Sequence, residues 1–120
     1  MIKIFEISET DDATLEAVNR LLPQLSKSAK LISLNTLQKL SNSECTRLYV
    51  AREGDFIFGM LSLVVFSIPT GTKAWIEDVV VDEGARGKGV GRKLMEHALD
   101  VAEELGAKSA DLTSRPSREA

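Results

Sequence analysis

The chain has 120 residues, of which 43% are hydrophobic and 28% are charged, and its formal net charge is −3. These values predict one soluble globular domain over residues 1–120. The negative charge argues against general nucleic-acid binding, and no apolar run is long enough to cross a membrane. Cys45 is the single cysteine, so an internal disulfide is excluded and a cytoplasmic location is expected.

The first third of the sequence predicts a strand followed by two helices. Residues 1–7 alternate lightly and are typical of a strand, and residues 8–12 are rich in helix-capping side chains. Apolar residues at helical spacing predict a helix over Leu15–Leu25, which Pro23 should end or kink. A second short helix is predicted over Leu31–Leu40.

Three consecutive strands are predicted next, over Thr46–Arg52, Phe56–Ile68 and Thr72–Val81. Residues 53–55 form a tight turn between the first two of them. Gly59 interrupts the long middle strand and indicates a bulge or a close approach of another backbone. The simplest arrangement is an antiparallel meander.

A helix over Gly89–Leu105 and a short strand over Ser109–Thr113 complete the predicted elements. Gly106 is a suitable residue after the helix end. We expect the last strand to run parallel to Thr72–Val81, joined through the helix by a right-handed crossover. A loop follows, in which Ser117 could cap another helix.

Glycines and basic residues are concentrated where the predicted helix begins. They occupy the stretch Arg86, Gly87, Lys88, Gly89, Val90, Gly91, Arg92 and Lys93. The first N–H groups of a helix have no acceptor within it, and the helix dipole favours an anion there. Glycines let a ligand approach those donors closely. The stretch therefore predicts a phosphate or pyrophosphate site.

Two common phosphate motifs do not fit this spacing. A nucleotide P-loop requires Lys and then Ser or Thr after its last glycine, but Gly89 is followed by Val90 and Gly91. A dinucleotide fingerprint requires a glycine three residues after Gly89, where this chain has Arg92.

The remaining Arg-x-x-Gly-x-Gly pattern, behind a strand that ends in Val-Asp, resembles the acetyl-CoA-binding signature of the GNAT family of N-acetyltransferases. The resemblance covers roughly Thr46–Arg118. It implies an α/β fold with a mixed, mostly antiparallel sheet and helices on both faces. It also implies acetyl-CoA as cosubstrate, with its pyrophosphate at Arg86–Gly91 and its pantetheine arm aligned by the backbone of Val79, Val80 and Val81.

The reaction implied by the resemblance is direct acetyl transfer to a primary amine of a small molecule or peptide. Glu77 and Asp78 are the candidates to bind that amine, and Glu77 is the candidate catalytic residue. Neighbouring strand residues point to opposite faces, so only one of the two should face a cleft. Glu77 has the same parity as Val79 and Val81. The alternative, a paired or solvent-facing strand carboxylate, is equally compatible with the sequence.

Other reactive side chains have structural interpretations. His97 is predicted to be a partly buried helix residue, and Trp75 a packing or interface residue. Cys45 has no base beside it and is not expected to be a nucleophile. Tyr49 lies in an early strand and does not match the tyrosine that often acts as general acid in the resembling family. No His/Cys cluster has metal-ligand spacing, so no metal is expected.

In that family a helix carrying the tyrosine, and usually two more strands, follow the last predicted strand. None of this precedes Ala120, so the family fold is expected to be C-terminally truncated. An alternative function is therefore a catalytically weak CoA-binding or interaction module. An unaccompanied edge strand at Ser109–Thr113 favours a homodimer or higher oligomer, possibly by element exchange. Nucleic-acid and membrane partners are not expected.

Overall fold

The computed structural model describes residues 2–108 and 110–112. Its elements are β1 (Lys3–Glu6), α1 (Asp12–Leu25), α2 (Leu34–Ser41), β2 (Thr46–Glu53), β3 (Phe56–Ile68), β4 (Gly71–Val81), the 3-10 turn η1 (Glu83–Ala85), α3 (Val90–Glu104) and β5 (Ala110–Leu112). The strands form one sheet in the order β1-β2-β3-β4-β5. Among the strands in the described residues, β4 and β5 pair in parallel and the other neighbours are antiparallel. The predicted α/β class with a mostly antiparallel sheet is confirmed.

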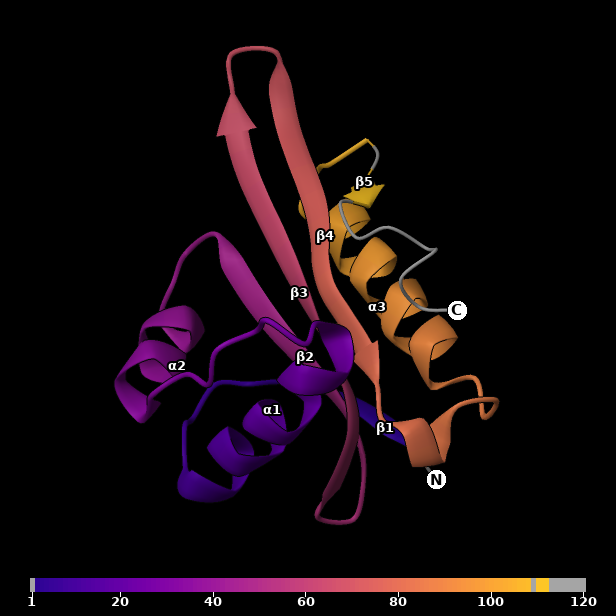
Figure 1. Cartoon of the computed structure of the whole chain (residues 1–120). Helices are drawn as coiled ribbons and strands as arrows, with labels where there is room; N and C mark the ends of the chain where they lie inside the picture. The colour runs from indigo at the N-terminus through magenta and orange to yellow at the C-terminus, as the bar shows by residue number, and fades with distance from the viewer. Residues whose placement is uncertain (1, 109, 113–120) are drawn as a thin grey trace.

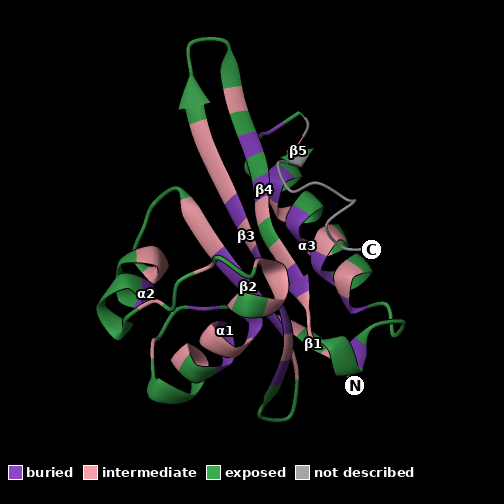
Figure 2. Ribbon diagram, viewed as in Figure 1, coloured by how far each residue is buried: buried purple, intermediate pink, exposed green. Residues whose placement is uncertain are grey.

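Helices cover both faces of the sheet, as Figure 1 shows. On one face α3 packs over the apolar side chains Tyr49, Leu61, Leu63, Ala74 and Ile76. On the other face α1 and α2 pack over Leu48, Val50, Ile57, Met60 and Val80. The inward sides of the helices are buried and their outer sides exposed, in agreement with their helical apolar spacing (Figure 2).

Helix α1 begins and ends close to the predicted positions. The Asp11 side chain accepts a hydrogen bond from the Thr14 backbone N–H at 2.7 Å and so caps the first turn. Pro23 lies inside the helix, which ends two residues later at Leu25. Pro23 has no N–H to donate to the carbonyl oxygen four residues earlier, so one hydrogen bond is missing shortly before the helix ends.

Helix α2 begins at Leu34, so the predicted start at Leu31 is wrong. The Ser33 side chain caps the helix by accepting from the Thr36 backbone N–H at 3.1 Å. Leu31 precedes this cap and is 67% exposed. The leucine spacing that suggested an earlier start continues across a capping serine, and the cap determines where the helix begins.

Gly59 shows both features that its position in β3 predicted. A register shift adjoins it, since Ala51 is opposite Gly59 while Arg52 is opposite Ile57. A Cβ atom at Gly59 would lie 3.0 Å from the Val80 carbonyl oxygen and 3.2 Å from a Leu94 methyl group. The missing side chain therefore allows α3 to pack close to β3.

A second irregularity lies in β4 at Asp78. Met60 is opposite Val80 and Ser62 is opposite Glu77, so β4 has one residue more than β3 between these positions. Asp78 has φ of 51°, the left-handed region that few residues other than glycine adopt. This combination is a β-bulge.

The bulge reverses the alternation of the strand. Ile76 lies on the α3 face, and beyond the bulge Val79 and Val81 lie on that same face while Val80 lies on the other. Glu77 therefore does not share a face with Val79 and Val81, and the parity argument made from the sequence is wrong. An inserted residue moves every later side chain of a strand to the opposite face.

Strand β5 confirms the predicted parallel neighbour of β4, with Ala74 opposite Ala110 and Ile76 opposite Leu112. The expected loop and cap at residues 114–117 lie outside the described residues. In the part of the chain that the structure describes, no helix combines the length and apolar character needed to span a bilayer.

Candidate functional site

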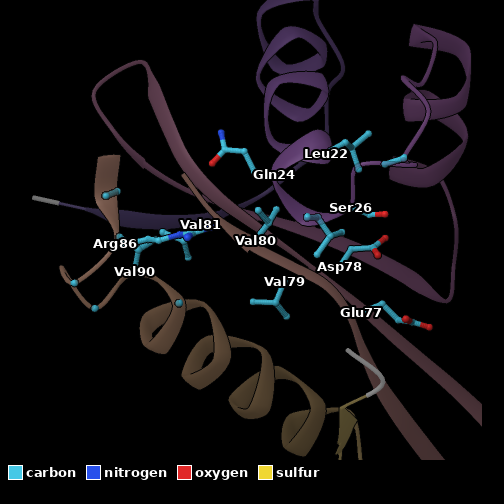
Figure 3. Close-up of a pocket in the computed structure, with 16 residues that line it drawn as sticks. Leu22, Gln24, Ser26, Glu77, Asp78, Val79, Val80, Val81, Arg86 and Val90 are labelled. Atoms are coloured by element: carbon cyan, nitrogen blue, oxygen red, sulfur yellow. The ribbon is translucent and has the colours of Figure 1, made fainter. Parts of the chain in front are cut away.

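A cavity of about 640 Å³ lies between the end of α1, the second half of β4 and the start of α3. Figure 3 shows the side chains around it. Sixteen residues form its wall: Leu22, Gln24, Leu25, Ser26, Ala29, Glu77, Asp78, Val79, Val80, Val81, Ala85, Arg86, Gly87, Gly89, Val90 and Gly91. Most of the predicted site residues are therefore gathered around one space.

One end of the cavity is formed by the loop that leads into α3. Gly87 and Gly89 adopt φ of +88° and +76°, which glycine reaches without steric cost. Gly89 is the N-cap of α3 and supplies no side-chain cap, so the first N–H groups of the helix are left for another acceptor. Gly89, Val90 and Gly91 line the cavity at this point. The geometry is that of an anion site at a helix start.

The four basic side chains of this stretch are not equivalent. Arg86 lines the cavity. Lys88 lies with its Nζ 6.0 Å from the centre of the Phe58 ring, and Arg92 is paired with Glu96 at 3.4 Å. These two, and the exposed Lys93, are outside the cavity wall. Among the lining side chains, Arg86 is the cation available to an anionic ligand.

Glu77 and Asp78 both line the cavity, contrary to the expectation that only one of them would. The left-handed conformation of Asp78 removes the usual alternation between neighbouring side chains. In Figure 3 the Asp78 carboxylate lies on the side of the cavity formed by the end of α1, and Arg86 lies at the opposite end. Two carboxylates thus share the cavity with one guanidinium group.

Burial raises the pKa of the Asp78 carboxyl above its ordinary value of 3.8, and the neighbouring Glu77 carboxylate raises it further. Asp78 is nevertheless exposed by surface area. The two observations are compatible because a residue can be open to the cavity while its neighbours displace part of its hydration shell.

The backbone of β4 is also part of the cavity wall. Val79, Val80 and Val81 line it, and Val80 and Val81 pair with β3 on one side. On the other side, the described part of β5 pairs with β4 as far as Ile76. Within the described residues, the edge of β4 beyond Ile76 therefore has no strand neighbour on that side.

The family resemblance implied that the helical region before β2 helps to shape the acceptor side, but no individual residue of α1 was predicted to line the cavity. Leu22, Leu25 and Ser26 line the wall opposite the start of α3. The helical spacing of the two leucines was visible, but it fits sheet packing equally well. The serine that ends the helix gave no functional signal of its own.

Four other reactive side chains lie away from this cavity. The His97 and Tyr49 rings meet edge to face, with centroids 4.9 Å apart, in agreement with a structural histidine. Burial and the nearby Glu6 carboxylate raise the pKa of Tyr49. Trp75 is 42% exposed and contacts Phe66, and the free Cys45 is exposed. Within residues 2–108 and 110–112, no cluster of three His, Cys, Asp or Glu side chains could hold a metal ion.

Comparison with solved structures shows where this architecture occurs. A transcriptional regulator from Bacillus halodurans C-125 matches with a TM-score of 0.84 and 25% identity, over 98% of this chain and 85% of that protein. An aminoglycoside acetyltransferase from an uncultured soil metagenomic sample, in complex with sisomicin, matches with a TM-score of 0.83 and 24% identity, over 97% of this chain and 79% of that one.

Glucosamine-6-phosphate N-acetyltransferase from Arabidopsis thaliana matches with a TM-score of 0.78 and 22% identity, over 98% of this chain and 84% of that protein. At these identities the latter two likenesses concern the fold alone.

Two sequence comparisons go beyond the fold. Streptothricin acetyltransferase from Streptomyces lavendulae is 62% identical over 32 residues, which is 27% of this chain and 17% of that protein. This match is a local one. The sequence pattern of the acetyltransferase (GNAT) family matches residues 12–120, a range that includes α1, the bulged strand β4 and the glycine loop before α3. With nearly its whole length matched, the chain belongs to the GNAT acetyltransferase family.

Proposed function

We propose that this chain transfers the acetyl group of acetyl-CoA to a primary amine by direct transfer within a ternary complex. The observation that carries the proposal is one cavity that joins a glycine-lined helix start to two carboxylates. Family membership supports it, since acetyl-CoA is the cosubstrate of the family that the motif resembles. Acetyl-CoA supplies the activated acetyl thioester.

The pyrophosphate is proposed to bind at the start of α3. The unpaired N–H groups at Gly89, Val90 and Gly91 would donate to its oxygens, and the helix dipole adds a favourable potential. The Arg86 guanidinium is the lining cation that would neutralise its charge. Lys88, Arg92 and Lys93 would contribute only a diffuse potential at this end of the cavity.

The edge of β4 beyond Ile76 is proposed to hold the pantetheine arm. Val79, Val80 and Val81 line the cavity, and within residues 2–108 and 110–112 no strand pairs with β4 beyond Ile76 on the β5 side. Backbone groups there would orient the arm along the strand towards the carboxylates. The thioester would then lie between the loop and the acidic end of the cavity.

The acidic residues are proposed to receive the acceptor amine. The parity argument that favoured Glu77 does not hold, and both carboxylates line the cavity. We assign proton acceptance to Asp78, because its raised pKa makes the carboxylate a stronger base. Glu77 would hold the ammonium form before transfer. Asp78 would take one proton from the ammonium group, and the neutral amine nitrogen would then bond to the acetyl carbon as the carbon–sulfur bond breaks. The second nitrogen proton would pass to the leaving CoA thiolate, which gives the free thiol.

The charges of the cavity favour a cationic acceptor, such as a polyamino sugar or a basic peptide end. Apart from Arg86, the lining side chains are two carboxylates, the neutral polar groups of Gln24 and Ser26, and apolar groups such as those of Leu22 and Leu25. An acceptor phosphate placed there would meet carboxylates without a balancing cation. The local sequence match to streptothricin acetyltransferase agrees with a cationic acceptor.

Release of the free CoA thiol in the presence of an amine panel tests the function. Sisomicin, glucosamine and glucosamine 6-phosphate form a useful panel, because the last two differ only in a phosphate. We expect turnover with the cationic amines and less with the phosphate ester. Asp78→Asn should lower turnover without weakening CoA binding. CoA binding with no turnover on any amine would favour a binding module instead.

We also propose a cytoplasmic location and association into a homodimer. The single exposed Cys45 fits a cytoplasmic protein. Association into a homodimer stays a prediction, which light scattering over a range of protein concentrations would test.

A further inference from the structure

The Arg20 side chain of α1 contacts Asp82, directly after β4, and residues at the start of β3. One guanidinium nitrogen donates to a carboxylate oxygen of Asp82, and the other donates to the Ile57 carbonyl oxygen at 2.6 Å. The guanidinium also lies 4.5 Å from the centre of the Phe56 ring. The Arg20 and Asp82 side chains are 33% and 18% exposed, so the contact is partly shielded from water. Three groups therefore hold the guanidinium in place, namely the Asp82 carboxylate, the Ile57 carbonyl and the Phe56 ring.

Asp82, the ion-pair partner of Arg20, also forms a hydrogen bond within the turn that precedes the glycine loop. The second carboxylate oxygen of Asp82 accepts from the Gly84 backbone N–H at 3.0 Å. One turn further along α1, the Gln24 side-chain oxygen accepts from the Glu83 backbone N–H at 2.9 Å. Helix α1 thus contacts the turn of residues 82–85 through two of its side chains.

We propose that Arg20 is a positioning residue for the cofactor loop and acts through Asp82. The inference rests on the proposed binding of the CoA pyrophosphate at this loop. Residues 86–91 contain three glycines, two of them in the left-handed region, so the loop has little conformational preference of its own. Its geometry is set at its two ends, by the Asp82 turn and by α3. Weakening the Asp82 turn lowers the fraction of molecules in which the N–H groups of the loop are aligned. The apparent affinity for CoA falls with that fraction.

The same helix also lines the other end of the cavity, with Leu22, Leu25 and Ser26. Arg20 therefore links the helix that contacts the acceptor end to the loop at the cofactor end. This arrangement differs from a general stabilising ion pair, which would raise the free energy of unfolding without a specific effect on the loop.

A matched ion pair elsewhere in the chain separates these two roles. Arg47 in β2 contacts Glu6 in β1 at 3.2 Å, and the Arg47 side chain is also 33% exposed. Neither residue lines the cavity. Arg47→Met removes an ion pair whose arginine is as exposed as Arg20, although Glu6 is more exposed than Asp82, and it does not alter the loop. It is therefore the control for Arg20→Met.

Two measurements on the full chain test the proposal. Amide hydrogen exchange without ligand should show faster exchange over residues 82–91 in Arg20→Met, and no such local change in Arg47→Met. Calorimetry with CoA should show affinity about 2- to 30-fold weaker in Arg20→Met, the range for residues that act without touching the ligand. Arg20→Lys keeps the charge and should recover part of both effects.

Asp82→Asn provides a second route if Arg20→Met folds poorly. It removes the carboxylate charge and keeps an oxygen for the Gly84 N–H. The effects of Asp82→Asn and Arg20→Met on loop exchange should not add in the double variant, because both remove the same contact. Additive effects would show that the two residues act separately and would overturn the proposal.

Unchanged exchange over residues 82–91 in Arg20→Met, or an equal change in Arg47→Met, would also overturn it. A wild-type chain that does not bind CoA, together with the local exchange change, would refute the proposed function while supporting the positioning of the loop by Arg20.

Discussion

Replacement of Gly89 by valine tests two roles of this glycine at the start of α3. One is to adopt a left-handed backbone, and the other is to let the pyrophosphate approach the helix N–H groups. Gly89 has φ of +76°, and a Cβ atom added there would meet no protein atom within 4 Å. A side chain therefore fits sterically, but the left-handed backbone costs about 1–2 kcal/mol for an L-residue, and somewhat more for a β-branched one. We expect the free energy of unfolding, measured with urea, to fall by about this amount.

Gly54 in the β2–β3 turn is a close structural match for Gly89. Its φ is +61°, and a Cβ atom there would also meet nothing within 4 Å. Gly54 does not line the cavity. Gly54→Val should therefore lower the free energy of unfolding by a similar amount and leave CoA affinity unchanged.

Gly89→Val should in contrast weaken CoA binding by at least about tenfold in calorimetry, equivalent to about 1.4 kcal/mol. The added methyl groups would stand at the cavity wall, where the pyrophosphate must approach the N–H groups. Gly89→Asn is a useful intermediate, since asparagine tolerates the left-handed region but still adds a side chain. It should lose affinity with less loss of stability. Unchanged CoA affinity in Gly89→Val would refute the pyrophosphate site.

Three further predictions concern neighbouring positions. Arg86→Ala should weaken CoA binding by about 1.5–3 kcal/mol through loss of a charge-assisted hydrogen bond, whereas Arg92→Ala, whose side chain is 84% exposed, should have little effect in the same titration. Gly59→Ala should lower the free energy of unfolding by about 1–3 kcal/mol, since its Cβ would lie 3.0 Å from a backbone oxygen; an unchanged urea midpoint would contradict the close packing. The pKa of Asp78 is raised above 3.8 in the folded state, so the free energy of unfolding of the wild type should fall relative to that of Asp78→Asn as the pH rises above 3.8. Below pH 3.8 the carboxyl group is mostly protonated in both the folded and the unfolded state, and urea unfolding should show no charge-related difference between the two proteins.

The parts of the fold that the sequence predicted are those encoded by local patterns. Glycines before an apolar stripe of helical spacing located the start of α3 at Gly89. Three apolar runs separated by turn residues located β2, β3 and β4. Asp11 and other capping side chains located the start of α1. Each of these signals depends on residues within a few positions of one another.

The features that the sequence did not predict depend on distant partners. The bulge at Asp78 is defined by the register with β3, in which Ser62 and Met60 are the reference points. The aspartate itself does not indicate a bulge, since an aspartate in a strand is usually interpreted as a surface residue. Arg20 and Asp82 are 62 positions apart, and only the packing of α1 against the sheet brings them together.

The bulge in β4 allows its valines to pack against α3 while its two carboxylates line the cavity. In a regular strand, Asp78 and Val80 would share the face of Ile76, on which α3 packs, and Val79 would face α1. A carboxylate on the packed face would lose hydration without a partner. The extra residue returns Val79 and Val81 to the α3 face and leaves Glu77 and Asp78 both at the cavity. The strained backbone of Asp78 is therefore the structural feature that allows a buried strand to present two acidic side chains at one site.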